Sequence, residues 1–594
     1  TELLTWVLMQ LFKQNIMKRP KITFFLTIVL GITLHSCLDM EPQDQLGGKN
    51  MWTSVNDYKQ FANTFYSWTR DFSSVVYDGT HSDKRSDLIT YQSYNEFSRG
   101  INSIPSSDAN YTDNYKHIRR TNLLIENAET YSKPEDIKQY LGEAYFFRAY
   151  SYFDLLQLYG DVIITKKPLD ITDPEMKVKR NDRSEVVDLI IDDLGHAIDN
   201  LPAFKELSTE EEGRISKEGA QAFLSRVALY EGTWQKSRNN NQNTERTKNL
   251  LDIAAKAART VMDAKYGYSF RLFGTDSETK VLGDSAQKYM FILENEKSNP
   301  AGIKKSANHE YIFARRHDQI LASIGKNITQ ECLANVQWIT RKFANLYLCD
   351  DGLPIDKSDR FQKYDEKVSE FLNRDNRMRY TLLKPGTRYW GNKFGRTSWQ
   401  WDEVDLKTSK LYDPASGTCY GNQKWSAERV VPDTQEGYDF PLIRYAEVLL
   451  NYAEAVYERD DKIENEDLNI SLNQVRQRVN GSMPALTKEF AQTHGLDMRT
   501  EIRRERTVEL FNEGFRIDDL KRWKTAENEM PQAMLGIKWK GTQYESWNTP
   551  FSLNDDGCIV VETGRQWADK NYLYPLPSDQ LQLNPNLGQN PGWK

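Results

Sequence analysis

The spacing of apolar residues predicts helices over much of this chain. Between residues 115 and 128 the apolar positions fall on a single stripe, which is typical of an amphipathic helix. From 141 to 158 apolar and aromatic residues cover more than one face, so we expect a largely buried helix there, ended by Gly160. A further amphipathic helix is predicted over residues 185–198.

Two pairs of alanine-rich helices are predicted further along the chain. Segments 218–232 and 251–264 form the first pair, and segments 443–457 and 468–479 form the second. Small side chains let helices approach closely, and paired helices of this length are similar to tetratricopeptide units. We therefore expect a mainly α fold built on a tetratricopeptide-like helical-repeat scaffold, whose repeat register the sequence does not fix.

The pattern changes between residues 266 and 442. Gly, Pro, Asn and Asp recur there, helical stripes thin out, and strand-like pieces such as 311–313 appear. We expect one domain over 51–594, with a helical frame at about 52–265 and 441–537. Long loop-rich insertions at about 266–440 and 538–576, with a few short strands, are then the expected place for binding residues.

The first residues have the pattern of an export signal. Residues 17–21 are basic and residues 22–34 are apolar, a run too short to cross a bilayer about 30 Å thick. Residues 1–36 are therefore interpreted as a signal peptide, with a misassigned start before Met17.

The end of this segment is similar to a bacterial lipobox. Residues 34–37 read Leu-His-Ser-Cys, which would let Cys37 take a diacylglyceryl group. Two or more acyl chains at one terminus give stable membrane anchoring. We expect a mature protein that begins at Cys37 and a lipidated tether over 37–50; the alternative is a chance cysteine after a cleavable signal.

Composition and charge exclude several kinds of partner. The chain has 14 Trp, 31 Tyr and 25 Phe, and rings with a polar edge stack on sugars and on protein partners, although helix packing accounts for most of them. The net charge is -7, and scattered Lys and Arg give no continuous basic face. We therefore expect no nucleic-acid partner.

Metal, cofactor and catalytic signatures are missing from the sequence. Cys332, Cys349, Cys419 and Cys558 show no CxxC or Cys/His spacing, which leaves free thiols or one incidental bridge open. The sequence contains no HExxH, no GxSxG and no phosphate loop followed by GK[ST]. We expect no metal, no cofactor and no enzymatic activity.

Several motifs occur in an order that is similar to one protein family. They are GEAYFFRAY (142–150), DLLQLYGD (154–161), NHEYIF (308–313), RDNR (374–377), PLIRYAEVLL (441–450), AEA (453–455), RRER (503–506), EGFR (513–516), DLKRW (519–523), LYPLP (573–577) and QNPGW (589–593). Together they resemble the SusD/RagB family of outer-membrane lipoproteins over about residues 52–594.

This resemblance implies both a fold and a role. It implies four tetratricopeptide-like units, a face that binds an oligosaccharide or polysaccharide nutrient, and a SusC-like TonB-dependent transporter that the protein covers as a lid. It also implies a lipid-anchored protein at the outer membrane that faces the cell exterior. The alternatives are a surface hydrolase with an unrecognised carboxylate pair, and capture of a non-glycan nutrient such as peptide.

Two candidate glycan-binding positions follow from the resemblance. Tyr111 and Asn114 stand where starch-binding members place an aromatic ring and an amide, although Tyr replaces the more typical Trp, and a helix packing pair is the alternative. Arg85 lies in the loop 78–87, which lines the site in relatives, and simple solvation of its charges is the alternative.

Two further candidates follow from ring chemistry, because flat rings stack on sugars and planar polar groups pair with hydroxyls. The richer one is the loop 388–402, and Trp338 beside Asn335 and Gln337 is the weaker one. The alternative for Trp399 or Trp401 is that its ring packs against the helical scaffold and anchors the loop. The candidate residues of the loop are Tyr389, Trp390, Arg396, Trp399 and Trp401.

A cluster of charged motif residues could be read as acid/base machinery, since a glycosidase needs two carboxylates that flank one bond. Arg and Glu three or four residues apart on helices more often form surface or semi-buried ion pairs, which is the interpretation we prefer. The residues are Arg444, Glu447, Arg506, Glu509, Glu513, Arg516 and Asp519.

Overall fold

The computed structural model of this chain describes residues 51–91, 95–333, 337–366, 368–384, 388–389, 399–400, 417–429, 432, 434–546 and 552–594. The chain divides into two units between residues 57 and 58, and the scaffold, the ion network and the sites described below belong to the second, residues 58–594. The predicted signal peptide, Cys37 and the tether over 37–50 lie outside the described residues and stay predictions. Within the described ranges, no helix has both the length and the apolar character that membrane crossing requires.

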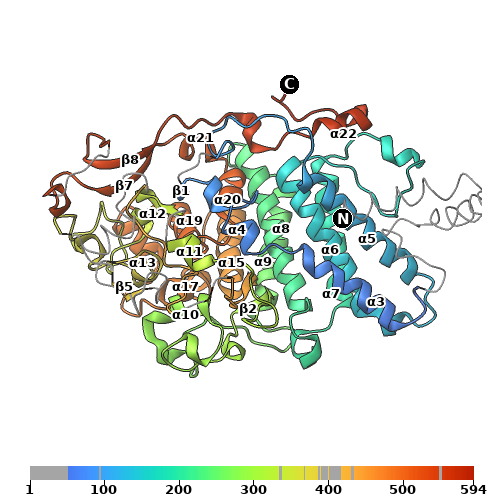
Figure 1. Ribbon diagram of the computed structural model, residues 1–594, viewed down its shortest axis with the longest axis horizontal. Helices are drawn as coiled ribbons and strands as arrows, with labels where there is room; N and C mark the ends of the chain where they lie inside the picture. Colours follow the sequence, from blue (N-terminus) through green and yellow to red (C-terminus); the bar gives the residue numbers. More distant parts are fainter. Residues whose placement is uncertain are drawn as a thin grey trace, which may run out of the picture. The chain divides into compact units, whose positions relative to one another are not determined.

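A run of long helices, each packed against the next, forms the scaffold (Figure 1). They are α5 (Ala109–Ala128), α6 (Lys138–Tyr159), α7 (Arg183–Asn200), α8 (Lys217–Arg238), α9 (Glu245–Met262) and α15 (Tyr445–Asp460). Both predicted helix pairs are present, since α8 packs on α9 and α15 packs on α17 (Leu472–Gln477). The predicted mainly α fold is confirmed.

Capping side chains determine where these helices begin. The Asp182 carboxylate accepts from the N–H of Ser184 and forms a capping box with Glu185 at the start of α7. The Asp108 carboxylate accepts from the N–H of Asn110, so α5 begins at Ala109 rather than near residue 115. Tyr111 therefore lies in the first turn of α5, not in a loop before it.

Shorter helices make up most of the remaining regular structure. They are α3 (Val55–Asn63), α4 (Phe72–Val75), α10 (Ala286–Tyr289), α11 (Ile328–Leu333), α12 (Arg341–Leu346), α13 (Asn376–Thr381), α16 (Asn465–Asn469), α18 (Lys488–Thr493), α19 (Met498–Glu509), α20 (Arg516–Arg522), α21 (Ala526–Glu529) and α22 (Ser578–Leu583).

The strands are short, and those described form antiparallel pairs. The pairs are β1 (Ile89–Thr90) with β3 (Trp338–Ile339), β2 (Tyr311–Arg315) with β6 (Phe440–Arg444), β4 (Arg388–Tyr389) with β5 (Trp399–Gln400), and β7 (Met534–Lys538) with β8 (Cys558–Glu562). Because β6 runs directly into α15, the β2–β6 pair ties the irregular middle of the chain to the helical scaffold.

A network of buried ion pairs lies where these elements meet. Arg444, at the end of β6, contacts carboxylate oxygens of Glu310, Glu509 and Glu513, each at 2.7 Å. Arg478 contacts Glu310 at 3.0 Å and Glu509 at 2.7 Å. Although burial opposes ionisation, the neighbouring guanidiniums of Arg478, Arg444 and Arg377 hold the pKa of Glu509 well below its usual value.

The other charged motif residues are also ion-paired. Glu447 pairs with Arg226 at 2.6 Å, and Arg506 pairs with Asp519 at 2.9 Å. Arg516 contacts Asp87 at 2.8 Å. These residues form ion pairs, as predicted, but the predicted spacing of three or four residues on one helix is wrong, because the pairs are buried and most join segments far apart in the sequence.

The first prediction concerns Glu509, which is fully buried. Replacing it by Gln keeps the shape but leaves the guanidiniums of Arg444, Arg478 and Arg377 short of a negative partner. Breaking a buried ion pair in this way costs about 3–5 kcal/mol. We expect a large fall in the urea midpoint of Glu509→Gln.

The matched control is Glu464→Gln, which removes the surface pair with Lys488, whose partners are 51% and 47% exposed. Surface pairs contribute about 0–1 kcal/mol, so its midpoint should barely move. If the two variants had equal urea midpoints, the buried network would stabilise the fold no more than a surface ion pair does, which would contradict this account.

A buried carboxyl group holds the start of α11. Glu436 accepts from the backbone N–H groups of Ile328 at 2.5 Å and Thr329 at 2.8 Å. Burial raises the pKa of Glu436 from 4.5 to about 7. The folded protein therefore keeps this proton up to about pH 7, whereas the unfolded chain loses it near pH 4.5.

The proton on Glu436 contributes to the free energy of unfolding. This contribution is fully present below about pH 4.5 and is lost as the pH rises through about 7. Because one pKa unit corresponds to about 1.4 kcal/mol, the loss amounts to about 3 kcal/mol. Glu436→Gln has no proton to lose at this position. The difference between its thermal midpoint and that of the wild type should therefore shift in favour of the variant as the pH rises from 5 to 8. A constant difference between the two proteins across this range would show that Glu436 does not titrate as described.

Candidate functional site

The loop after α4 carries a cluster of polar and aromatic side chains. A short 3-10 helix, η3 (Asp83–Arg85), lies within this loop. Asp83, the first residue of this helix, is fully buried. Its carboxylate accepts from the backbone N–H of Asn512 at 2.6 Å and of Arg516 at 3.3 Å. The segment between α19 and α20 therefore fixes the position of this loop.

Asp78 is the hub of this cluster, which we call the Asp78 cluster and define as Tyr77, Asp78, Arg85, Tyr91 and Asn95. The Asp78 carboxylate accepts from Asn95 Nδ2 at 2.7 Å, from the Tyr91 hydroxyl at 3.2 Å and from Arg85 Nε at 3.3 Å. Its side chain is 43% exposed. A carboxylate has roughly four acceptor positions, so three described donors leave one for a ligand hydroxyl.

The rings of Tyr77 and Tyr91 are half-buried, and the Tyr91 hydroxyl contacts the Asp78 carboxylate. The Lys84 ammonium lies 5.0 Å from the centre of the Tyr91 ring, and Lys326 lies 5.6 Å from that of Tyr77. Burial and the nearby Asp78 carboxylate raise the pKa of Tyr91 to about 12, so its hydroxyl stays neutral at physiological pH. The cluster thus places two rings and a half-exposed carboxylate together, while the buried Asn95 amide and the Arg85 guanidinium hold the carboxylate in place.

The structure brings Arg85 and Trp338 to the same region. Arg85 donates to the Tyr574 hydroxyl at 2.7 Å and to the backbone oxygen of Asp78 at 3.0 Å. Trp338 pairs with Thr90 in the β1–β3 ladder, next to Tyr91 in the chain. Trp338 is only 9% exposed, so its ring does not present an open face.

Tyr111 and Asn114 belong to the buried base of this region. Tyr111 is 3% exposed and packs edge-on against Tyr159, which packs in turn against Tyr574, the partner of Arg85. Asn114 is also buried and donates to the backbone oxygen of Asn110. Both side chains are thus packed in the structure without a ligand, and their role in glycan binding stays a prediction, with helix packing as the alternative.

The loop 388–402 falls almost entirely outside the described residues. Trp390, Arg396 and Trp401 are not described, and for Tyr389 and Trp399 only the backbone is, in which the β4–β5 register pairs the two residues. Their role in binding stays a prediction.

Sequence reasoning did not single out Tyr91, Asn95 or Tyr574. Tyr91 and Asn95 stand 13 and 17 residues from Asp78, and Tyr574 lies 489 residues from Arg85, so no local spacing marks them. Tyr574 lies inside the motif LYPLP, and this motif is the one feature of the sequence that could have pointed to it. Over the described part of the chain, His, Cys, Asp and Glu do not gather in groups that could hold a metal ion.

Gly417 gives the next prediction, because it lies directly against Trp338. A Cβ at this position would stand 2.1 Å from the indole ring, and its φ is +96°. Gly417→Ala should therefore push Trp338 away from the β1–β3 ladder and lower the thermal midpoint clearly.

Gly541→Ala is the matched control, since Gly541 also has a positive φ, +76°, but open space around it. It should show only the backbone cost of about 1–3 kcal/mol. Equal losses in both variants would contradict the close contact with Trp338.

Comparison with known proteins places the fold. A model described as the SusD family matches residues 291–593, and a model described as starch-binding associating with outer membrane matches residues 38–229. SusD-like protein P2 of Formosa agariphila is 26% identical over 606 residues, which cover 97% of this chain and 100% of that protein.

Solved structures share this fold at low sequence identity. A SusD-like carbohydrate binding protein from Bacteroides fragilis has a TM-score of 0.69 at 21% identity, covering 90% of this chain and 99% of its own. A laminarin binding SusD-like protein has a TM-score of 0.55 at 20% identity, covering 91% and 99%. Since the first family model spans more than half of the 594 residues, in the order of the motifs given above, the chain belongs to the SusD family.

Proposed function

We propose that this protein captures an oligosaccharide or polysaccharide nutrient at the cell surface and delivers it to a SusC-like TonB-dependent transporter of the outer membrane. The observation that carries the proposal is the Asp78 cluster, in which a half-exposed carboxylate keeps an acceptor position beside partly exposed rings. A sugar presents an apolar face of C–H groups and a rim of hydroxyls, and this cluster offers a partner to each.

Binding without cleavage fits the electrostatics of the described residues. A glycosidase needs a carboxylic acid with a raised pKa beside its substrate, together with a second carboxylate. Among the described residues, burial raises the pKa of six carboxyl groups, namely Asp83, Glu143, Asp193, Glu370, Glu436 and Glu505. All six are at most 6% exposed, so a polymer on the surface does not reach them.

The comparisons support the ligand class and the location. Two relatives of the same fold are described as carbohydrate binding and laminarin binding, and the N-terminal family model is described as associating with outer membrane. We extend this to a lipid anchor at Cys37 and to a surface-exposed orientation. We also place a second contact surface in the loop 388–402, through Tyr389, Trp390, Arg396, Trp399 and Trp401.

Calorimetric titration of the soluble form that starts after Cys37 tests the site. Laminari- and malto-oligosaccharides are suitable probes. Tyr91→Ala removes a ring and Asp78→Asn removes the acceptor charge, and each should weaken binding about tenfold, which corresponds to about 1.4 kcal/mol. The control Tyr266→Ala removes a half-buried tyrosine outside the cluster and should leave the affinity unchanged.

The same samples distinguish binding from hydrolysis. The proposal predicts saturable binding and no new reducing ends after prolonged incubation with the polysaccharide. New reducing ends would show an enzyme. Affinity that survives both cluster variants but falls in Trp399→Ala would move the site to the loop 388–402.

A further inference from the structure

We propose that a second, separate pocket on this protein binds a neutral sugar unit. The pocket has a volume of about 270 Å³ and lies along β2, between the residues around Gly213 and the segment 305–309. It shares no residue with the Asp78 cluster. Drug-sized ligand pockets begin at roughly 300 Å³, so this pocket suits a single small ring.

The charges that line the pocket cancel in pairs. Arg316 contacts Glu212 at 3.0 Å and Asp439 at 3.6 Å, and Lys305 contacts the other oxygen of Asp439 at 2.7 Å. Lys305 also donates to the backbone oxygens of His317 and Gly437, so its three hydrogens are all used. Arg214, the third cation of the lining, contacts Glu143 at 2.7 Å and also pairs with Glu211. Each lining cation thus has a carboxylate partner, and a charged ligand would have to break one of these pairs.

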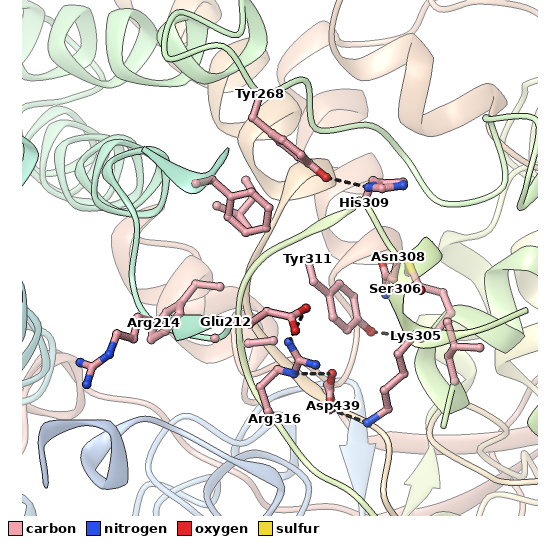
Figure 2. Close-up of a pocket in the computed structure, with 17 residues that line it drawn as sticks. Glu212, Arg214, Tyr268, Lys305, Ser306, Asn308, His309, Tyr311, Arg316 and Asp439 are labelled. Atoms are coloured by element: carbon pink, nitrogen blue, oxygen red, sulfur yellow. Dashed lines mark hydrogen bonds and ion pairs between the residues drawn. The ribbon is translucent and has the colours of Figure 1, made fainter. Parts of the chain in front are cut away.

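A tyrosine–histidine pair on the opposite side of the pocket supplies a free donor (Figure 2). Tyr268 Oη lies 2.6 Å from His309 Nδ1. Burial lowers the pKa of His309 and raises that of Tyr268, so both groups are neutral near pH 7. If Tyr268 donates, His309 keeps its Nε2–H, and if His309 donates, Tyr268 keeps its O–H; either way one donor has no partner among the described residues.

Rings and small polar groups complete the lining. Tyr311 lies between the Tyr268–His309 pair and the Arg316–Asp439 pair (Figure 2). The Phe204 and Tyr268 rings pack 4.6 Å apart, and both are only partly buried. Asn308 also lines the pocket, and its Nδ2 has no described partner, because only its Oδ1 is used, by the N–H of Glu310. Stacking surface together with uncharged donors suits a polyhydroxylated, uncharged ligand.

A neighbouring cavity of about 380 Å³ adjoins the pocket. The two cavities share six lining residues, namely Glu212, Gly213, Arg214, Phe313, Ala314 and Arg316. These six residues therefore form a wall common to both cavities, and a change in this wall affects both.

Saturation-transfer NMR with the neutral methyl glycosides of glucose, galactose and mannose tests the inference. The protein carries both Tyr91→Ala and Asp78→Asn, which remove the ring and the acceptor charge of the Asp78 cluster, so that the signal lost in a pocket variant reports on the pocket and failure of one site is separable from failure of the other. At least one methyl glycoside should give a signal. Glucuronate and glucosamine should bind at least about tenfold more weakly, because each must disrupt an ion pair.

Ala314→Phe fills the shared wall of both cavities, and a strand position accepts an aromatic residue readily. It should abolish the signal. Val560→Phe, at a half-buried position in β8 outside the pocket, is the matched control and should retain it. Unchanged thermal midpoints confirm that both variants fold.

Three results would overturn the inference: no signal from any of the three neutral glycosides, a signal that persists in Ala314→Phe, or stronger binding of a charged sugar. Oligosaccharide titration of the wild type reports on the Asp78 cluster independently of these outcomes.

Discussion

The buried ion network around Arg444 and Glu509 is the interaction on which the irregular half of this protein depends. Between α9 and α15 the described residues form only short α-helices, of four to six residues, which cannot define the path of the chain by packing alone. Buried charges have no water to stabilise them, so every member must find its partner within hydrogen-bonding distance. Glu310 before β2, Arg377 in α13, Arg444 at the end of β6 and Glu509 at the end of α19 thereby fix one another.

The segment from Glu509 to Asp519, which contributes two carboxylates to this network, also fixes the position of the candidate site. Its carboxylates Glu509 and Glu513 face the network, and Glu513 also binds Lys424 at 2.6 Å. Toward the Asp78 cluster, the segment contacts Asp83 through its backbone and Asp87 through Arg516. One polar segment therefore connects the scaffold to the loop on which we propose that a glycan binds, and the motif EGFR within it has this structural role.

The sequence predicts the scaffold better than the site, for a physical reason. Helix periodicity is local, so α6 and the α8/α9 pair could be read from residue spacing, and the error at α5 came from a cap, Asp108, that lies before the apolar stripe. Ion pairing was predicted correctly, but as neighbours on helices, whereas Arg444 and Glu310 are 134 residues apart. The side chains that meet at Asp78 are likewise brought together by tertiary contacts. Arg85 was therefore identified only through the family resemblance, and Tyr91 and Asn95 were not identified.

The most direct test of this account is a crystal structure of the protein soaked with a laminari- or malto-oligosaccharide for which it has measurable affinity. The account predicts a sugar ring against Tyr91 or Tyr77, with at least one hydroxyl within hydrogen-bonding distance of the Asp78 carboxylate. An oligosaccharide bound elsewhere, with the Asp78 cluster bare and its hydrogen bonds unchanged, would contradict it.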